Sequence, residues 1–304
     1  MIDSDDDLSV RECITFAWWN TSLAPAGNSR ACEELKRNAA EVIAYLIIES
    51  KVDFMALGEL SAEDFQELQS LAVFSAYEFH DGVSKAGRSQ FDTCYITNPA
   101  KITIHSLENI TSARGDSVMK IAQRIDFSAN NSGTIFHVFA SHWPSRLWCE
   151  ENHANRHILG IRLRDEIDEL LKVNTTPPHI VLMGDYNDEP FDKSLSSHVM
   201  ATRDIDLVLK RKHLFYNPYW SQMGRGKSGR SLNGGSYYYQ RGETTHWYTF
   251  DQIIYSHAFV SAKVWRLADH NEHISDVPGL VELVTSTKSK FDHMPVYGTI
   301  EKVS

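Results

Sequence analysis

The sequence predicts a single α/β domain, because short apolar runs of strand length alternate with amphipathic stretches of helix length along the whole chain. The chain has 304 residues, enough for one large domain, and its 42% hydrophobic and 23% charged residues are ordinary for a packed globular protein. No internal repeat is visible, and no Ser-, Gly- or Pro-rich linker divides the chain. We therefore expect one domain over residues 9–304, preceded by an acidic tail over residues 1–8.

Each element of this domain has a local signal. Apolar residues at helical spacing predict a helix over residues 33–50, and a third helix over 152–173 has Arg and Glu on one face and Ile and Leu on the other. Between them, Ser61 and Asp64 form a capping-box pattern that opens a second helix, which ends near residue 72. Apolar runs predict strands at residues 14–18, 54–57, 95–97, 121–127, 135–140, 180–183, 252–255 and 296–300.

Charge and cysteine content exclude several classes of protein. Thirty Lys and Arg against forty Asp and Glu give a net charge of −10, so the whole molecule is not a basic nucleic-acid coat. The four cysteines are scattered without C-x-x-C spacing, which argues against a disulfide framework or a structural zinc site. The longest apolar run, residues 42–48, is far shorter than a membrane span of roughly 18 residues. With an acidic start that does not resemble a signal peptide, we expect a cytoplasmic protein without an integral membrane segment.

One stretch departs from this acidic average. Residues 210–242, which we interpret as an insertion, contain seven Lys or Arg and no Asp or Glu, and they also carry many aromatic residues. Cations interleaved with aromatic rings suit a phosphate backbone and unpaired bases, although a solvated loop that balances an acidic surface would have the same composition. The candidate nucleic-acid contacts within this stretch are Arg225, Lys227, Arg230, Tyr238 and Arg241.

The most informative pattern is the position of polar residues at the ends of the predicted strands. Four early strands end in a polar residue, whereas the last two strands are preceded by polar residues. If the late strands run antiparallel to the early ones, all these side chains meet at one edge. Each residue alone could be a turn former or a helix cap, but together they indicate a site. Its predicted members are Asn20, Glu59, His142, Asp185, Asn187, Asp251, Asp292 and His293.

The chemistry of this set points to a hard divalent cation. Carboxylate and amide oxygens without thiolates favour Mg²⁺ or Mn²⁺ over zinc. Because Mg²⁺ typically takes only one or two carboxylates from the protein, the remaining carboxylates can orient a water molecule and the imidazoles can bind or protonate phosphate oxygens. The residues themselves therefore predict hydrolysis of a phosphate ester.

At these residues the sequence resembles the endonuclease/exonuclease/phosphatase superfamily, whose fold is DNase I-like. The matching motifs are Trp19-Asn20, Gly58-Glu59, the His-Trp-Pro-Ser-Arg string at 142–146, the Gly-Asp-Tyr-Asn-Asp-Glu-Pro string at 184–190, the Phe-Asp-Gln-Ile-Ile string at 250–254 and the Asp-His-Met-Pro string at 292–295. The resemblance implies a four-layer sandwich, in which two mixed β-sheets pack face to face and are flanked by helices. The strings at 142–146 and 185–190 are most similar to those of bacterial nuclease-like members.

The resemblance also implies roles for the individual residues. Glu59 would be the principal metal ligand, assisted by Asn20 and Asp292. Asp185 and Asn187 would orient the attacking water, and the residue that acts as the formal base stays open. His293, paired with Asp292 or Asp251, and His142 would contact the phosphate. Arg88 and Arg146 are further candidates for phosphate contacts, with structural surface roles as the alternative.

Three functions follow as hypotheses. The leading one is a Mg²⁺- or Mn²⁺-dependent nuclease that cleaves DNA, or also RNA, with nucleic acid as its partner; the sequence leaves protein partners unknown. The second is a phosphatase or phosphodiesterase acting on small or lipid phosphoesters, of the inositol-phosphate or sphingomyelinase kind. However, the Trp-x-Asp-Arg string typical of inositol-polyphosphate 5-phosphatases is absent, and residues 249–252 read Thr-Phe-Asp-Gln instead. The third is an inactive module that binds a partner on the same scaffold.

Overall fold

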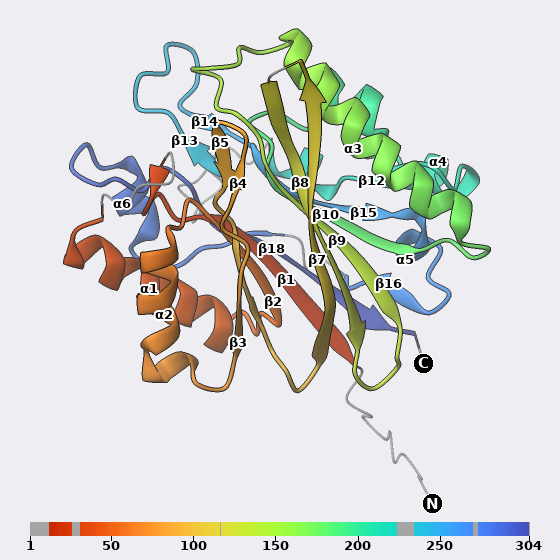
Figure 1. The fold of residues 1–304 in the computed structure, drawn as a ribbon, viewed down its shortest axis with the longest axis horizontal. Coiled ribbons are helices and arrows are strands. Elements are labelled where there is room, and N and C mark those ends of the chain that lie inside the picture. Colours follow the sequence, from red (N-terminus) through yellow and green to blue (C-terminus); the bar gives the residue numbers. More distant parts are fainter. Residues whose placement is uncertain (1–11, 26–30, 116, 224–233, 270–272, 304) are drawn as a thin grey trace, which may run out of the picture.

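The computed structural model describes residues 12–25, 31–115, 117–223, 234–269 and 273–303. The acidic tail and three of the predicted nucleic-acid contacts, Arg225, Lys227 and Arg230, lie outside these residues. Two large mixed sheets cross the middle of the molecule and helices cover their outer faces (Figure 1), as the resemblance implied. None of the described helices is long and apolar enough to cross a lipid bilayer.

The first sheet has the strand order β16-β18-β1-β2-β6-β3, with β17 paired to β18. Within it β1 and β2 run parallel, and β18 and β6 run antiparallel to their neighbours. The strands are β1 (Cys13–Asn20), β2 (Phe54–Gly58), β3 (Glu78–Asp81), β6 (Cys94–Thr97), β16 (Trp265–Leu267), β17 (His273–Ile274) and β18 (Val296–Lys302).

The second sheet has the strand order β11-β12-β15-β10-β9-β8-β7. Here β9 and β10 run parallel and β15 runs antiparallel to β10. Its strands are β7 (Ile102–Arg114), β8 (Ser117–Ala129), β9 (Ile135–His142), β10 (His179–Asp185), β11 (Ala201–Thr202), β12 (Phe215–Tyr216) and β15 (Asp251–Ser256). Two small hairpins lie outside both sheets: β4 (Ser84–Ala86) with β5 (Ser89–Phe91), and β13 (Tyr237–Tyr238) with β14 (Trp247–Tyr248).

The basic stretch is not simply an insertion. Phe215 and Tyr216 form β12, which pairs with β15 inside the second sheet. The first part of residues 210–242 therefore belongs to the core of the domain, so the insertion does not extend over the whole stretch. The separate hairpin β13–β14 begins in its last part.

A buried layer of aromatic side chains holds the two sheets face to face. Phe54 of the first sheet stacks on Phe127 of the second, with ring centroids 5.6 Å apart, and Phe127 in turn stacks on Phe136 at 5.0 Å. Successive side chains of a strand point to opposite faces, so Val181 and Met183 of β10 face this layer while Ile180 and Leu182 face the helices behind it. This explains why β10 is apolar without interruption.

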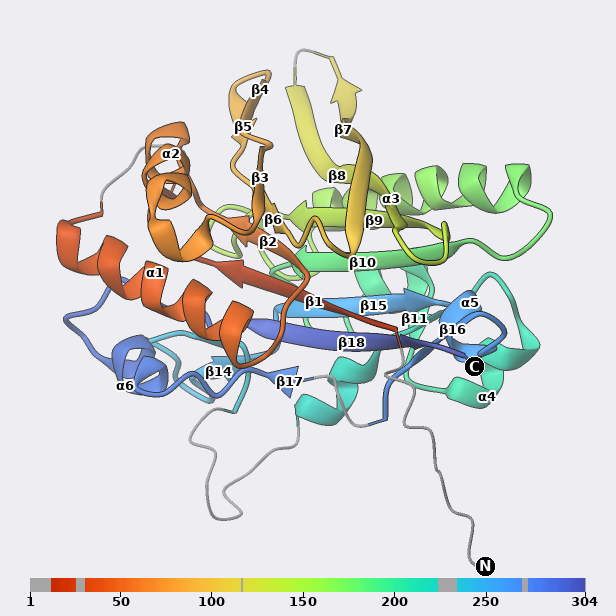
Figure 2. The same ribbon diagram turned by 90° about the horizontal axis from the view of Figure 1, so that it is seen from below.

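Helices close the outer face of each sheet. Figure 2 shows α1 and α2 on the side of the first sheet and α3 and α4 on the opposite side of the molecule. Ser61 caps α2 through the capping box that the sequence predicts. The helices are α1 (Glu33–Ile48), α2 (Ala62–Ser70), α3 (Ala154–Val173), α4 (Ile205–Lys210), α5 (His257–Val260) and α6 (Leu280–Thr285), with 3-10 turns at Ala72–Phe74 and Pro218–Gln222 and a π-helical turn at Ser194–Val199.

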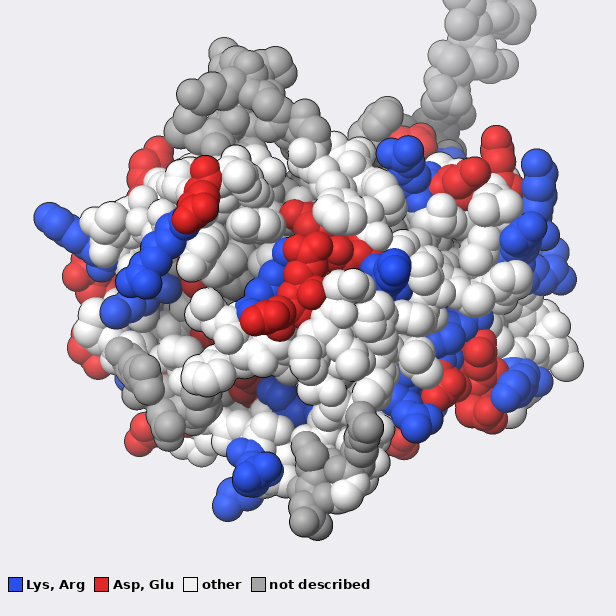
Figure 3. Space-filling view, turned by 90° about the horizontal axis from the view of Figure 1, so that it is seen from above, with Lys and Arg blue, Asp and Glu red and all other residues white. Residues whose placement is uncertain are grey.

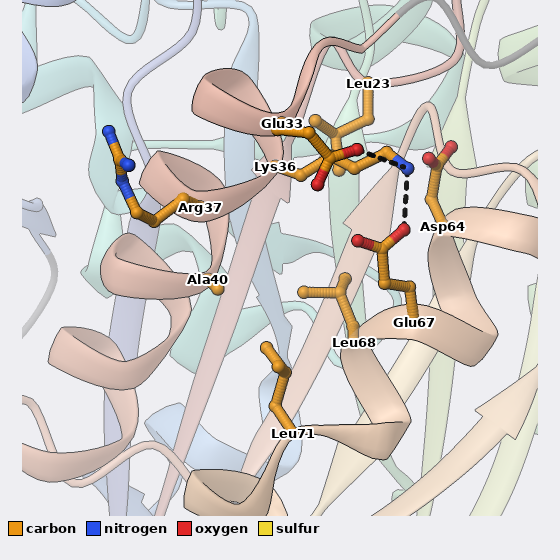
Figure 4. A pocket seen from close by; sticks show the side chains of 9 residues that line it. All are labelled: Leu23, Glu33, Lys36, Arg37, Ala40, Asp64, Glu67, Leu68 and Leu71. Carbon is orange, nitrogen blue, oxygen red and sulfur yellow. Dashed lines mark hydrogen bonds and ion pairs between the residues drawn. The ribbon is translucent and has the colours of Figure 1, made fainter.

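Helices α1 and α2 leave a cavity of about 200 Å³ between them (Figure 4). Lys36 of α1 reaches across it and contacts Glu67 of α2 at 2.6 Å, and it lies 3.9 Å from Glu33 of its own helix. These two partners account for the lysine charge, so this cavity is a feature of helix packing.

The directions of the strands place the predicted polar residues at one end of the sandwich. The carboxyl ends of β1 and β2 lie side by side, since Asn20 pairs with Gly58. In the second sheet, Asp185 is the register partner of both His142 and Asp251. Because β15 and β18 run antiparallel to these strands, their beginnings lie where the early strands end. The predicted edge is therefore confirmed.

Candidate active site

Asp185 lies at the centre of a single cluster formed by the predicted polar side chains. The Asn20 amide nitrogen is 3.5 Å from the Asp185 Oδ2 atom and 3.2 Å from the Glu59 Oε1 atom. His142 Nε2 lies 3.9 Å from the same oxygens of Glu59 and Asp185. On the other side, His293 Nε2 is 3.7 Å from Asp185 Oδ2. Residues far apart in the sequence thus face one another at the end of the two sheets.

The backbone around this cluster needs unusual conformations. Gly184 has φ of 151°, and a Cβ atom there would lie 1.9 Å from the carbonyl oxygen of Ser141 on the neighbouring strand, so only glycine fits before Asp185. Glu59 and Asn187 both have positive φ, 56° and 50°, which is uncommon for residues with a side chain. Such conformations gather at functional sites, where the surrounding structure holds side chains in set directions.

His293 is held by a buried carboxylate. Its Nδ1 atom lies 2.8 Å from Asp251 Oδ2, and the other oxygen of Asp251 accepts a 2.7 Å hydrogen bond from the indole of Trp18. The structure therefore selects Asp251, rather than Asp292, as the close partner of His293. Burial opposes protonation of His293, but Asp251 and then Asp185 raise its pKa well above the ordinary value.

His142 has an equivalent partner that the sequence analysis missed. Its Nδ1 atom lies 3.1 Å from Asp92, a buried residue in the loop between β5 and β6, and Lys120 lies 3.5 Å from the same carboxylate. Although burial alone would lower it, the charge and hydrogen bond of Asp92 raise the pKa of His142 to about 9. The signal was present: β6 runs antiparallel to β2, so a residue that precedes β6 lies at the same edge as Glu59.

Two further predicted residues have defined places at the edge of the cluster. Asn187 donates from its side-chain amide to the Trp143 carbonyl at 3.0 Å, and its backbone N–H donates to Asp185 Oδ1 at 2.9 Å. Asp292 accepts a 2.9 Å hydrogen bond from the hydroxyl of Ser22, and its side chain is about half exposed. Ser22 is a second contact that the sequence pattern did not indicate.

The donor set fits a divalent cation. Glu59, Asp185, Asp251 and Asp292 carry four negative charges when ionised, and the two imidazoles can balance only two of them. Burial, reinforced by Asp292, raises the pKa of Glu59, and burial with Asp251 raises the pKa of Asp185. A divalent cation among these oxygens would relieve both effects, and oxygen donors are those that Mg²⁺ and Mn²⁺ prefer.

Two neighbouring groups of residues could hold such an ion. Among the described residues, ligand atoms of Asp185, Asp251 and His293 all lie within 4.8 Å of one another. In that group, however, both oxygens of Asp251 already accept hydrogen bonds. Glu59, Asn20 and Asp292 form the second group. There Glu59 Oε1, Asn20 Oδ1 and Asp292 Oδ1 each accept one hydrogen bond, but no described residue donates to the second oxygen of either carboxylate, and this assignment stays a prediction.

The predicted substrate contacts have different outcomes. Arg146 is held by Asp192 at 2.7 Å and by Glu151 at 3.2 Å, which are structural contacts, and its contact with phosphate stays a prediction. Arg88 is exposed in the turn between β4 and β5, and Arg241 is exposed between β13 and β14. Neither is placed near the cluster by a described contact.

Tyr238 is the fourth candidate contact that the structure describes. It packs on Trp247, with ring centroids 5.0 Å apart, and it does not line the pocket that lies beside the cluster. Its neighbours Tyr237 and Tyr239 line a pocket of about 180 Å³ next to the cluster, because side chains alternate along the hairpin strand. Tyr238 thus lies outside this pocket, and its contact with nucleic acid stays a prediction. The other residues that line this pocket are Ser145, Arg146, Leu147, Asn187, Tyr248 and Phe250.

Figure 3 views the molecule from above and shows how charge is distributed on that face. Asp and Glu side chains gather near its middle, and Lys and Arg lie at separate points around them. The described part of this face thus has mixed charge rather than a continuous basic band.

Comparison with known proteins agrees with this architecture. Residues 37–298 match the model of the "Endonuclease/Exonuclease/phosphatase family". No curated protein sequence matches the chain.

Solved structures of the same fold have low sequence identity. The human Nocturnin catalytic domain with bound sulfate is 16% identical, with a TM-score of 0.60 over 97% of this chain and 96% of that one. TDP2 from D. rerio, complexed with a single-strand DNA product, is also 16% identical, with a TM-score of 0.60 over 95% and 99%. A mannosyl-6-phosphatase from Bacteroides thetaiotaomicron is 14% identical, with a TM-score of 0.55 over 96% and 100%.

The family model covers most of the chain, and the buried acidic cluster with its two imidazoles lies where the strands of both sheets meet. The chain belongs to the endonuclease/exonuclease/phosphatase family and is a metal-dependent phosphoesterase.

Proposed function

We propose that the protein is a nuclease that hydrolyses phosphodiester bonds in DNA, with RNA as the alternative polymer. The observation that carries this proposal is the aromatic pocket beside the cluster. Tyr237 lies over His293 with ring centroids 4.7 Å apart and stacks on Phe250 at 5.3 Å, and Tyr248 stacks on Phe250 at 5.0 Å. A wall of stacked rings next to a phosphate site suits a planar base, because every base offers a π-face.

Arg146 strengthens this wall. Its guanidinium lies 4.6 Å from the centre of the Phe250 ring and 5.9 Å from that of Tyr248, while carboxylates hold its far side. The cation therefore keeps the rings in place through cation–π contacts.

The residues of the cluster would have separate roles in the reaction. Glu59, Asn20 and Asp292 would hold Mg²⁺, or Mn²⁺, which when bound stabilises negative charge on the phosphate oxygens. Asp185 and Asn187 lie together and would orient the attacking water. His293, fixed by Asp251, and His142, fixed by Asp92, present their Nε2 atoms to the centre of the cluster, where protonated imidazoles can bind phosphate oxygens.

A phosphatase acting on small phosphoesters is the second candidate. The pocket is compact, about 180 Å³, and the same fold serves the mannosyl-6-phosphatase of Bacteroides thetaiotaomicron. Membership of the family alone does not separate these two substrates.

A substrate panel tests the proposal. The protein is incubated with plasmid, a single-stranded oligonucleotide, mannose 6-phosphate and a phosphorylated inositol, each with Mg²⁺ and with a chelator. We expect Mg²⁺-dependent shortening of the polymers, with Asp185→Ala and His293→Ala folded but inactive. Metal-dependent release of phosphate from the small esters without cleavage of either polymer would reject the nuclease and favour the phosphatase.

A further inference from the structure

Two consecutive apolar side chains project from the loop that follows His142. Trp148 is 89% exposed and Leu147 is 75% exposed, the two highest values among the large hydrophobic residues that the structure describes. Single exposed apolar residues are common on protein surfaces and need no explanation. Two adjacent ones, including a tryptophan whose indole is almost entirely in water, form a small apolar patch that a binding partner would cover.

The base of this loop is held rigidly although its tip is exposed. The backbone N–H groups of Trp148 and Cys149 both donate to the Ser145 carbonyl at 3.0 Å, which closes a tight turn. Arg146 anchors the turn from beneath, because its Nε atom donates to the Asn187 carbonyl at 3.0 Å and Asp192 holds its guanidinium. A rigid base means that little conformational entropy is lost when the tip binds something.

The loop also stands beside the proposed substrate pocket. Leu147 lines that pocket together with Tyr239 and Phe250, and Arg146 lies on the Phe250 ring. The exposed indole of Trp148 is the next residue along the chain. A substrate strand that extends out of the aromatic pocket on this side therefore contacts the apolar side chain of Leu147 and then the large planar ring of Trp148.

We propose that Trp148, supported by Leu147, is a stacking platform for an unpaired nucleobase of the substrate strand outside the pocket. This inference rests on the proposed nuclease function and adds a second base-binding position to it. Stacking on an exposed aromatic ring tolerates any base, so the platform would grip single-stranded nucleic acid without reading its sequence.

The charges beside the platform favour a base over a membrane. Glu150 and Glu151, which follow Trp148 after the intervening Cys149, are exposed, and Glu151 is paired with Arg146. Carboxylates at this position repel an anionic membrane surface, which presents many head groups at once, whereas a strand can place the neutral face of one base on the ring with its phosphates turned away from the carboxylates. Two apolar side chains also bury too little surface to anchor a protein in a bilayer.

Binding of labelled single strands tests the platform. Fluorescence anisotropy is measured with a ten-nucleotide strand and with an abasic strand of the same length, using the Asp185→Asn protein so that the strand stays intact. We expect Trp148→Ala to weaken binding of the base-containing strand by about 5-fold or more, the effect of removing one aromatic–base stack, while Trp148→Phe keeps most of the affinity. Val173→Ala, which truncates a 73% exposed residue at the end of α3, is the matched control and should leave affinity unchanged.

The outcomes separate this inference from the function on which it rests. If the wild-type protein cleaves the strand but Trp148→Ala binds it as tightly as the parent, the platform is wrong and the nuclease stands. An equal loss of affinity for the abasic strand would likewise overturn base stacking. Wild-type protein that neither binds nor cleaves any strand would instead reject the proposed function. Binding to anionic vesicles that Trp148→Ala abolishes, with strand binding unchanged, would replace the base by a membrane.

Discussion

Trp18 offers a sharp test of how the fold positions the cluster. Its indole N–H donates a 2.7 Å hydrogen bond to Oδ1 of Asp251, which is fully buried and whose other oxygen holds His293. In Trp18→Phe the ring volume is largely kept, but this oxygen loses its donor. A hydrogen bond to a buried charged group contributes about 1.5–3 kcal/mol, and at about 1.4 kcal/mol per factor of ten this corresponds to roughly a 10- to 150-fold change in rate.

We therefore expect Trp18→Phe to lower kcat on an oligonucleotide by about 10- to 150-fold with little change in KM, because Trp18 positions His293 through Asp251 without touching substrate. Trp265→Phe is the matched control: Trp265 is equally buried and donates to Thr134 Oγ1 at 3.1 Å, away from the cluster. Urea unfolding of both variants reports their stability. Undiminished kcat in Trp18→Phe, or an equal loss in Trp265→Phe, would refute the reasoning.

Three further predictions concern the metal, pH and backbone geometry. Mg²⁺ should raise the melting temperature of the wild type more than that of Glu59→Gln in calorimetry, because the cation relieves repulsion among carboxylates; equal shifts would contradict this. Burial lowers the pKa of His179 to about 4. As the pH falls from 6.5 towards 4, only the unfolded chain therefore gains the proton, and the free energy of unfolding decreases by up to about 3 kcal/mol. Urea unfolding across this range should show a flatter dependence on pH for His179→Gln than for the wild type, and parallel curves would contradict this. Gly184→Ala should fail to fold, since its Cβ would meet the Ser141 carbonyl. Gly133→Ala, with open space around it, should lower the free energy of unfolding by only about 1 kcal/mol. Soluble, stable Gly184→Ala would overturn this.

The regular parts of the fold were predictable from periodicity. Apolar spacing located α1, α2 and α3 to within two residues at each end, and the capping box at Ser61 gave the start of α2. The same reasoning missed β7 (Ile102–Arg114), although it is among the longest strands. The pairing of β7 with β8 shifts register between Ile104 and Ser106 and again at Ile110 and Thr111. Each irregularity interrupts the alternation of apolar and polar residues, which is the signal that identifies a strand.

The cluster itself was predictable because strand ends carry information about position. The rule that polar residues at strand ends meet at one edge brought Glu59, Asp185 and His293 together correctly. It was applied to the ends of the early strands and the beginnings of the last two, so Asp92, which precedes the antiparallel β6, was missed. Trp18 was missed for a different reason: an apolar residue in a strand gives no sign that its N–H meets a buried carboxylate.

The aromatic pocket could not be derived from the sequence in the same way. Tyr237, Tyr238 and Tyr239 are chemically alike, and only the hairpin register decides which rings face the cluster. A shift of one residue exchanges the two faces of a strand. Sequence composition therefore indicated an aromatic surface near residue 238, and the register decides that Tyr238 packs on Trp247 while Tyr237 and Tyr239 line the pocket.

The central claim is that a water molecule, oriented by Asp185 and its neighbours in the presence of Mg²⁺, attacks phosphorus and breaks a P–O bond. Cleavage of an oligonucleotide in ¹⁸O-labelled water, followed by mass spectrometry of the fragments, measures this directly. The account predicts one ¹⁸O atom on the new terminal phosphate, and no product when a chelator replaces Mg²⁺. Cleavage that proceeds with the chelator present, or a terminal phosphate without the label, would contradict it.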